Sequence, residues 1–76
     1  MVMKNMRMNK FDKSVETLKS STDYSVIEGV YEKLTKKEFD RCIEICYNYL
    51  IENKEKEKAK MLFEKSSFLK KYGRYA

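Results

Sequence analysis

The chain contains no histidine, no tryptophan and no proline, and its 76 residues include only two glycines and two cysteines. Histidine is the commonest general base and a common metal ligand, so its absence argues against most hydrolytic and metal-dependent sites. Tight hairpins depend largely on glycine and proline, so an all-β fold of many short strands is excluded. A chain of this length forms one small domain or one subunit of an assembly.

The remaining composition favours a compact helical protein. Hydrophobic residues make up 42% of the chain and charged residues 38%, which is too apolar for a disordered polypeptide. We therefore expect an all-α fold, a small bundle of three to four helices. A domain this short buries only about 60% of the surface that its unfolded chain exposes. Homodimerisation could complete such a bundle.

The positive charge is concentrated at the two ends of the chain. Residues 1–20 contain five basic and two acidic residues, residues 21–51 four and six, and residues 52–76 eight and four. Residues 1–9 hold four of the five methionines and no acid, and we expect them to form a flexible, basic, Met-rich arm. Residues 10–76 are then expected to form a single helical domain.

The sequence also indicates in which cellular compartment the protein is expected. No apolar run approaches the roughly 20 residues that a membrane-spanning helix requires, and no secretory signal is recognised at the N-terminus. Two cysteines without a disulfide framework suit a reducing compartment. We expect a cytoplasmic protein with no membrane partner. The many Lys, Asn, Ile, Tyr and Phe residues have AT-rich codons and suggest a microbial or phage source, in the latter case with the host-cell cytoplasm as its location.

Three helices are predicted over the first two thirds of the chain. Phe11, Val15 and Leu18 have helical spacing and predict a helix over residues 10–19. A second helix is expected over residues 24–34. Thr35-Lys-Lys-Glu38 is a capping box, in which the threonine hydroxyl accepts from the third helical amide and the glutamate from the threonine amide. It predicts that a third, central helix begins directly after Thr35.

Residues 52–60 are polar apart from one alanine and leave two alternatives open. In the favoured one the chain turns near Asn53, and a fourth helix runs from about Lys54 to Lys71. In the other, one continuous helix spans residues 36–72, which would demand a dimer. We expect the fourth helix to direct five residues toward the core and Phe63 away from it. The five are Met61, Leu62, Phe68, Leu69 and Tyr72.

The residue types give little support for catalysis. The serines have no histidine to activate them, and two isolated glycines cannot form a phosphate-binding loop. Cys42 and Cys46 are spaced four residues apart on an apolar helix face and are expected to be small buried core residues. We expect no enzymatic activity, no cofactor and no metal.

Protein binding is the function that the sequence favours. The small core, the apolar third helix and several tyrosines favour a non-enzymatic module that regulates or inhibits a partner protein stoichiometrically, with self-association as a further option. The candidate partner-binding residues lie in the third helix and toward the C-terminus. They are Tyr49, Phe63, Lys70, Lys71, Tyr72, Arg74 and Tyr75.

The alternative function is nucleic-acid binding without sequence specificity. The isoelectric point is about 9.2, and no acid follows Glu64. Bases could stack on aromatic rings of the C-terminal helix while lysines bind phosphates. The candidate residues for this function are Lys56, Lys60, Phe63, Lys70, Lys71 and Arg74. Lysine predominates over arginine, which favours diffuse charge over base-specific hydrogen bonds.

Overall fold

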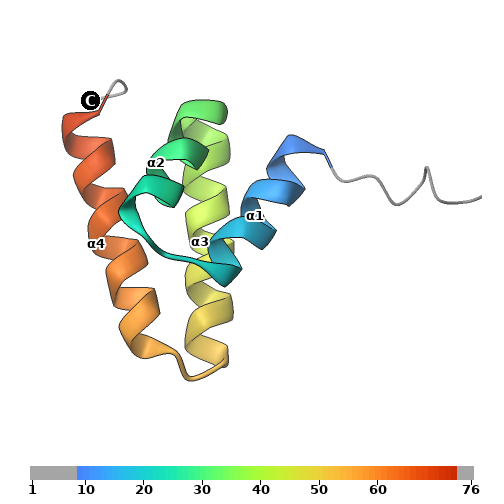
Figure 1. Ribbon diagram of the computed structural model, residues 1–76, viewed down its shortest axis with the longest axis vertical. Coiled ribbons are helices and arrows are strands. Elements are labelled where there is room, and N and C mark those ends of the chain that lie inside the picture. Colours follow the sequence, from blue (N-terminus) through green and yellow to red (C-terminus); the bar gives the residue numbers. More distant parts are fainter. Residues whose placement is uncertain (1–8, 74–76) are drawn as a thin grey trace, which may run out of the picture.

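The computed structural model describes residues 9–73, which form a bundle of four helices without a strand (Figure 1). The helices are α1 (Lys10–Ser20), α2 (Tyr24–Lys33), α3 (Lys36–Glu52) and α4 (Lys56–Tyr72). The predicted all-α fold is confirmed. Residues 1–8 of the predicted arm lie outside the described residues, as do Arg74 and Tyr75.

Helix α3 occupies the centre of the bundle. It packs against α1 on one side and against α4 on the other, and α2 packs on α4 (Figure 1). Helices α3 and α4 run antiparallel and are joined by a short turn. The apolar character of the third helix predicted this central position.

Side-chain caps define where two of the helices begin. The Asn9 carboxamide oxygen accepts a hydrogen bond from the Asp12 amide at 2.8 Å at the start of α1. At the start of α3, the Glu38 amide donates to the Thr35 hydroxyl at 3.2 Å, and the Thr35 amide donates to the Glu38 carboxylate at 3.0 Å. The predicted capping box is therefore confirmed.

The chain reverses direction between α3 and α4. Lys54 adopts the left-handed conformation with φ of 60°. The Lys54 amide donates to the Ile51 carbonyl at 3.0 Å and the Glu55 amide to the Leu50 carbonyl at 2.8 Å. This is a Schellman motif with lysine where glycine is usual. The favoured turn near Asn53 is confirmed, the continuous helix is wrong, and α4 begins at Lys56, two residues later than expected.

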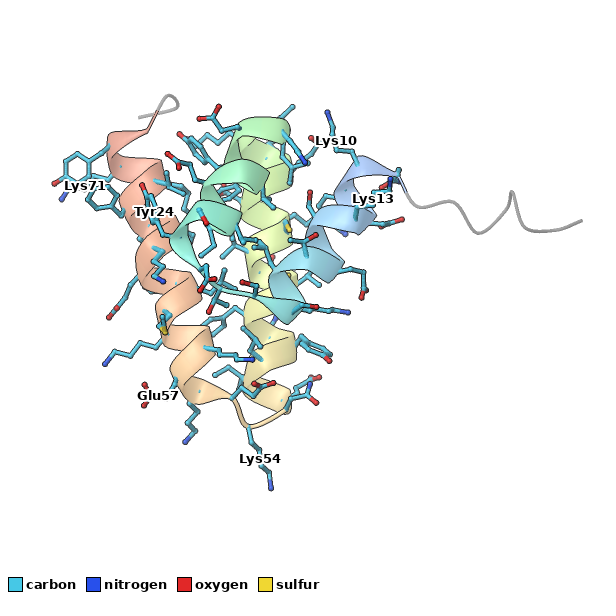
Figure 2. The ribbon with its side chains drawn as sticks, in the orientation of Figure 1. Lys10, Lys13, Tyr24, Lys54, Glu57 and Lys71 are labelled. Carbon is cyan, nitrogen blue, oxygen red and sulfur yellow. The ribbon has the colours of Figure 1, made fainter. Side chains whose placement is uncertain are left out.

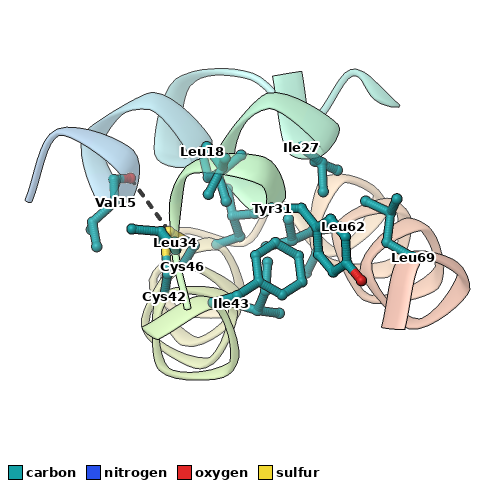
Figure 3. Close-up of a cluster of buried hydrophobic side chains, with 14 residues drawn as sticks. Val15, Leu18, Ile27, Tyr31, Leu34, Cys42, Ile43, Cys46, Leu62 and Leu69 are labelled. Carbon is teal, nitrogen blue, oxygen red and sulfur yellow. Dashed lines mark hydrogen bonds between the residues drawn. The ribbon is translucent and has the colours of Figure 1, made fainter. Parts of the chain in front are cut away.

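The core is a cluster of buried side chains from all four helices (Figure 3). Cys42 and Cys46 are buried within it as free thiols, as expected. The Cys46 thiol donates a hydrogen bond to the Val15 carbonyl at 3.3 Å, which connects α3 to α1. A hydrogen bond with Cys46 and burial raise the pKa of the Cys42 thiol well above its usual range. Both thiols are buried, so they are packing elements and not exposed nucleophiles.

Helix α4 buries a different face from the one that the sequence predicts, as if the helix were rotated about its axis. The buried residues are Ala59, Leu62, Ser66 and Leu69. Leu62 and Leu69 are core residues as expected, but Met61, Phe68 and Tyr72 are exposed, so that part of the prediction is wrong. The small side chains of Ala59 and Ser66 allow α4 to lie close to its neighbours. The Ser66 hydroxyl donates to the Phe63 carbonyl at 3.1 Å, so its burial leaves no unpaired donor.

The end of α4 meets α2 at Gly73. A β-carbon at this position would lie 2.5 Å from the Tyr31 hydroxyl oxygen, a distance that the packing does not allow. The Tyr31 ring packs edge-on against Phe39 at 5.0 Å between ring centroids. Glycine therefore permits the chain to pass over a core tyrosine at the end of α4.

Candidate protein-binding surfaces

The rotation of α4 exposes apolar side chains on both sides of its buried stripe. Phe63 lies on the side that faces α3, and it is 58% exposed. Phe68 and Tyr72 lie on the side that faces α2, and they are 52% and 64% exposed. The two sides form different surfaces, a groove on the α3 side and a row of exposed side chains on the α2 side.

The concave surface is a groove between α3 and α4 with a volume of about 360 Å³. We call it the α3/α4 groove, and its lining residues are Asp40, Ile43, Glu44, Tyr47, Phe63, Ser66, Ser67 and Lys70. The rings of Tyr47 and Phe63 approach across it, with 6.1 Å between their centroids. An apolar groove with a few charged groups on its rim is typical of a site that receives a side chain of a partner.

An ion pair closes one end of the α3/α4 groove. The Lys70 ammonium lies 3.0 Å from Asp40 Oδ1. This oxygen is shielded from water and makes no hydrogen bond within residues 9–73, so the ammonium compensates its charge. Glu44 lies on the same wall and makes no ion pair within the described residues. Its carboxylate is thus available to a cation from outside.

The surface on the α2 side is a row of exposed side chains on α4 and the start of α2. We call it the aromatic ridge, and it consists of Tyr24, Met61, Phe68 and Tyr72. The Phe68 ring contacts Tyr24 edge-on at 6.3 Å and Tyr72 at 4.9 Å between centroids. Figure 2 shows Tyr24 on α2 directed toward α4. Because contiguous exposed apolar side chains often mark an interaction site, the ridge is a second candidate interface.

The structure divides the predicted partner-binding residues among separate surfaces. Phe63 and Lys70 line the α3/α4 groove, whereas Tyr72 belongs to the aromatic ridge. The Lys71 ammonium lies 5.5 Å from the centroid of the Tyr72 ring. Tyr49 faces α1, where the Lys19 ammonium lies 4.6 Å from its ring centroid, so it joins neither surface. Arg74 and Tyr75 lie outside the described residues.

The predicted nucleic-acid-binding residues are also only partly brought together. At about 100° per residue, Lys56, Lys60, Phe63 and Lys70 fall along one side of α4. Lys70 is compensated by Asp40, and Lys71 lies further around the helix. The result is a short basic strip beside the acidic wall of α3, and Arg74 lies outside the described residues.

Sequence reasoning missed a basic cleft between α1 and α2. It has a volume of about 480 Å³ and is lined by Lys10, Lys13, Ser14, Thr17 and Lys33, with no acid. Figure 2 shows Lys10 and Lys13 at the start of α1, on the opposite side of the molecule from Lys71. The spacing of Lys10 and Lys13 gave a local signal, but the approach of Lys33 depends on tertiary packing. The sequence prediction also assigned Phe68 to the core, whereas it is exposed.

Within residues 9–73, no helix is long and apolar enough to cross a membrane. Comparison with protein-family models, with curated proteins and with solved structures gives no match. The function is therefore inferred from the geometry of the chain's own residues.

Proposed function

We propose that the chain is a non-enzymatic protein-binding module, a stoichiometric regulator or inhibitor, whose partner docks in the α3/α4 groove. The observation that carries this proposal is Phe63, which is 58% exposed in the wall of an apolar groove and lies 6.1 Å from Tyr47 between ring centroids. Exposed aromatic side chains at a concave site are the groups that most often supply binding energy.

The charges of the groove indicate what the partner presents. Asp40 is compensated by Lys70, whereas Glu44 has no ion-pair partner within the described residues. The groove therefore suits an apolar side chain that enters between Tyr47 and Phe63, with a lysine or arginine beside it that pairs with Glu44. A rim charge of this kind contributes to orientation and association rate more than to affinity.

The proposal is tested by capturing partners from a microbial or phage-infected lysate with the full chain and identifying them by mass spectrometry. Phe63→Ala is the decisive variant, because the side chain is exposed and its removal leaves the buried stripe of α4 intact. It is expected to weaken capture of the specific partner by about tenfold or more. Glu44→Lys is expected to weaken it less and mainly through the association rate.

Ile45→Ala is the matched control, since Ile45 is an exposed apolar residue on the other side of α3 from Tyr47. It should leave capture unchanged. Circular dichroism of each variant checks that the helices remain folded. Equal capture by wild type and Phe63→Ala would overturn the assignment of the groove.

Nucleic-acid binding is the second candidate function, and the basic cleft between α1 and α2 favours it. Lys10, Lys13 and Lys33 line this cleft without an acid. Three ammonium groups around one concave surface suit a phosphate backbone and give affinity without base recognition. The cleft is a better candidate than the C-terminal helix, where Asp40 compensates Lys70.

A salt titration of binding to a mixed DNA and RNA pool tests this candidate. Affinity should fall steeply with salt, and Lys13→Ala should weaken binding and reduce the slope. Lys56→Ala on α4 is the control and should have less effect. Absence of binding at low salt would remove nucleic acid as a ligand. Nuclease treatment of the lysate distinguishes a protein partner from one that is held by nucleic acid.

A further inference from the structure

The aromatic ridge follows a helical repeat that suits the pairing of two helices. Met61 and Phe68 are seven residues apart, and Glu64 and Lys71 follow each of them by three residues. This 3–4 alternation places all four side chains along one outer stripe of α4. The stripe is thus apolar at Met61 and Phe68 and oppositely charged at Glu64 and Lys71.

We propose that two copies of the chain associate through their aromatic ridges, with α4 packed antiparallel against α4 of the second copy. In a dimer with two-fold symmetry the same surface serves both partners, so each contact occurs twice. A two-fold axis near the level of Ser67 brings Met61 opposite Tyr72 of the second copy. The same axis brings the two Phe68 rings together.

The charges on the stripe are the reason to assign a second copy as the occupant. In the antiparallel arrangement Glu64 lies opposite Lys71 of the second copy, and the symmetry creates this pair twice. A parallel arrangement would place Glu64 opposite Glu64 of the second copy and Lys71 opposite Lys71, and such pairs of like charges repel each other. Glu64 makes no ion pair within the described residues, so its carboxylate is available for the contact.

The shape of the ridge supports the same arrangement. Tyr24, Glu64, Lys65 and Phe68 line a shallow, open depression beside α4. The Lys65 ammonium is held away from the stripe by a hydrogen bond of 3.1 Å to the Thr22 carbonyl. An aromatic ring of the second copy can therefore enter the depression next to Phe68 and Tyr24. This surface is separate from the α3/α4 groove, so a dimer would present two free grooves.

Sedimentation equilibrium of the full chain over about 1 µM to 1 mM tests the dimer, since exposed interfaces of this kind associate in that range. The expected mass rises from 9.2 kDa to twice that value. Phe68→Glu should abolish the increase. Phe63→Ala is the control in the groove and should leave the association constant unchanged.

Charge reversal distinguishes this antiparallel arrangement from other dimers. Glu64→Lys or Lys71→Glu alone places like charges opposite each other at two points and should weaken association by about tenfold. The double variant restores both pairs in reversed order and should return the association constant to near its original value. Both residues are exposed, so the variants are expected to fold.

A chain that remains monomeric at the highest concentration would overturn the proposal. A dimer that still forms in the Phe68→Glu variant would also overturn it. The same holds for a double charge-reversal variant that associates no better than the single variants. These outcomes do not affect the α3/α4 groove. A monomer whose partner capture depends on Phe63 would retain the proposed function and lose only the dimer.

Discussion

The two sides of α4 differ in both shape and charge. On the α3 side, Phe63 lines a groove in which an ion pair links Lys70 to Asp40. On the α2 side, Phe68 and Tyr72 stand out from the helix beside Glu64 and Lys71, which lie where a second helix could pair with them. A groove can receive one side chain, whereas an exposed stripe along a helix can pack against another helix.

The difference arises from which residues are buried between the two sides. Ala59 and Ser66 alternate with Leu62 and Leu69 in the buried stripe. This stripe places Phe63 on the α3 side of α4 and Phe68 and Tyr72 on the α2 side, and all three are more than half exposed. Both candidate interfaces therefore depend on one shared core, and changes in that core should affect them together.

The largest expected effect comes from Leu62→Ala in the shared stripe. Leu62 is fully buried, and its truncation should lower the free energy of unfolding by about 2–5 kcal/mol. A small domain has only a few kcal/mol of stability, so partner capture and self-association should both be lost. Urea denaturation measured by circular dichroism checks this outcome. Loss of one activity with retention of the other would show that the two sides do not share this core.

The next largest effect is expected from replacing one phenylalanine on each side of α4 by alanine. Phe63→Ala should weaken partner capture by about tenfold or more and leave self-association unchanged, because it removes only the groove wall. Phe68→Ala should weaken self-association and leave capture by the monomer unchanged. Both residues are more than half exposed, so each variant should remain folded.

Binding at low chain concentration and sedimentation at high concentration provide the two measurements. If either variant impairs both activities without unfolding the chain, the two surfaces are parts of one interface.

The sequence predicted the features that depend on neighbouring residues. The capping box at Thr35 requires only two side chains three residues apart, and both of its hydrogen bonds are present. For the polar residues 52–60 the turn near Asn53 was the favoured of two alternatives, although Lys54 gave no sign of its left-handed conformation. Short-range chemistry of this kind is read directly from the order of residues.

The rotation of α4 could not be predicted in the same way. Met61, Phe68 and Tyr72 form an apolar side that is as convincing in sequence as the true one, and only packing against α3 and α2 favours Ser66 over Phe68 as a core residue. The α3/α4 groove depends on Asp40 and Lys70, which are distant in sequence and meet across two helices. Phe63 was identified because it is an aromatic residue outside the predicted core face.

A third, smaller effect is the dependence of folding stability on pH, which should influence both binding surfaces of α4 equally. Interaction with Cys46 and burial raise the pKa of the Cys42 thiol in the folded chain, whereas the hydrogen bond with Cys42 lowers the pKa of the Cys46 thiol. Below about pH 8.5 the Cys42 thiol is protonated in both states and contributes no pH dependence. Above the usual thiol pKa the unfolded chain releases both thiol protons and the folded chain retains the one on Cys42, so stability should fall by up to about 1.4 kcal/mol per pH unit. Nearer neutral pH the lowered pKa of Cys46 acts in the opposite direction.

Urea denaturation between about pH 7.5 and 9.5 measures this slope, and Cys42→Ala should reduce it. Both binding activities should decline together as stability falls. A stability that is independent of pH in this range would contradict burial of the thiol.

The smallest expected effect concerns the turn that orients α4 relative to α3. Lys54 adopts φ of 60° at the position where a Schellman motif usually has glycine. Lys54→Gly removes the steric cost of that conformation, partly offset by the greater freedom of glycine in the unfolded chain. The net result should be a gain of about 0.5 kcal/mol in unfolding free energy, measured by urea denaturation.

Gly29→Ala is the converse control, because a β-carbon there meets no atom within 4 Å and the change should stabilise α2 by up to about 1 kcal/mol. Lys54 lies at the end of the bundle and its side chain points away from it (Figure 2). Capture and self-association by Lys54→Gly should therefore equal those of the wild type. A loss of stability would mean that the turn uses a different conformation, and the orientation of both sides of α4 would then have to be revised.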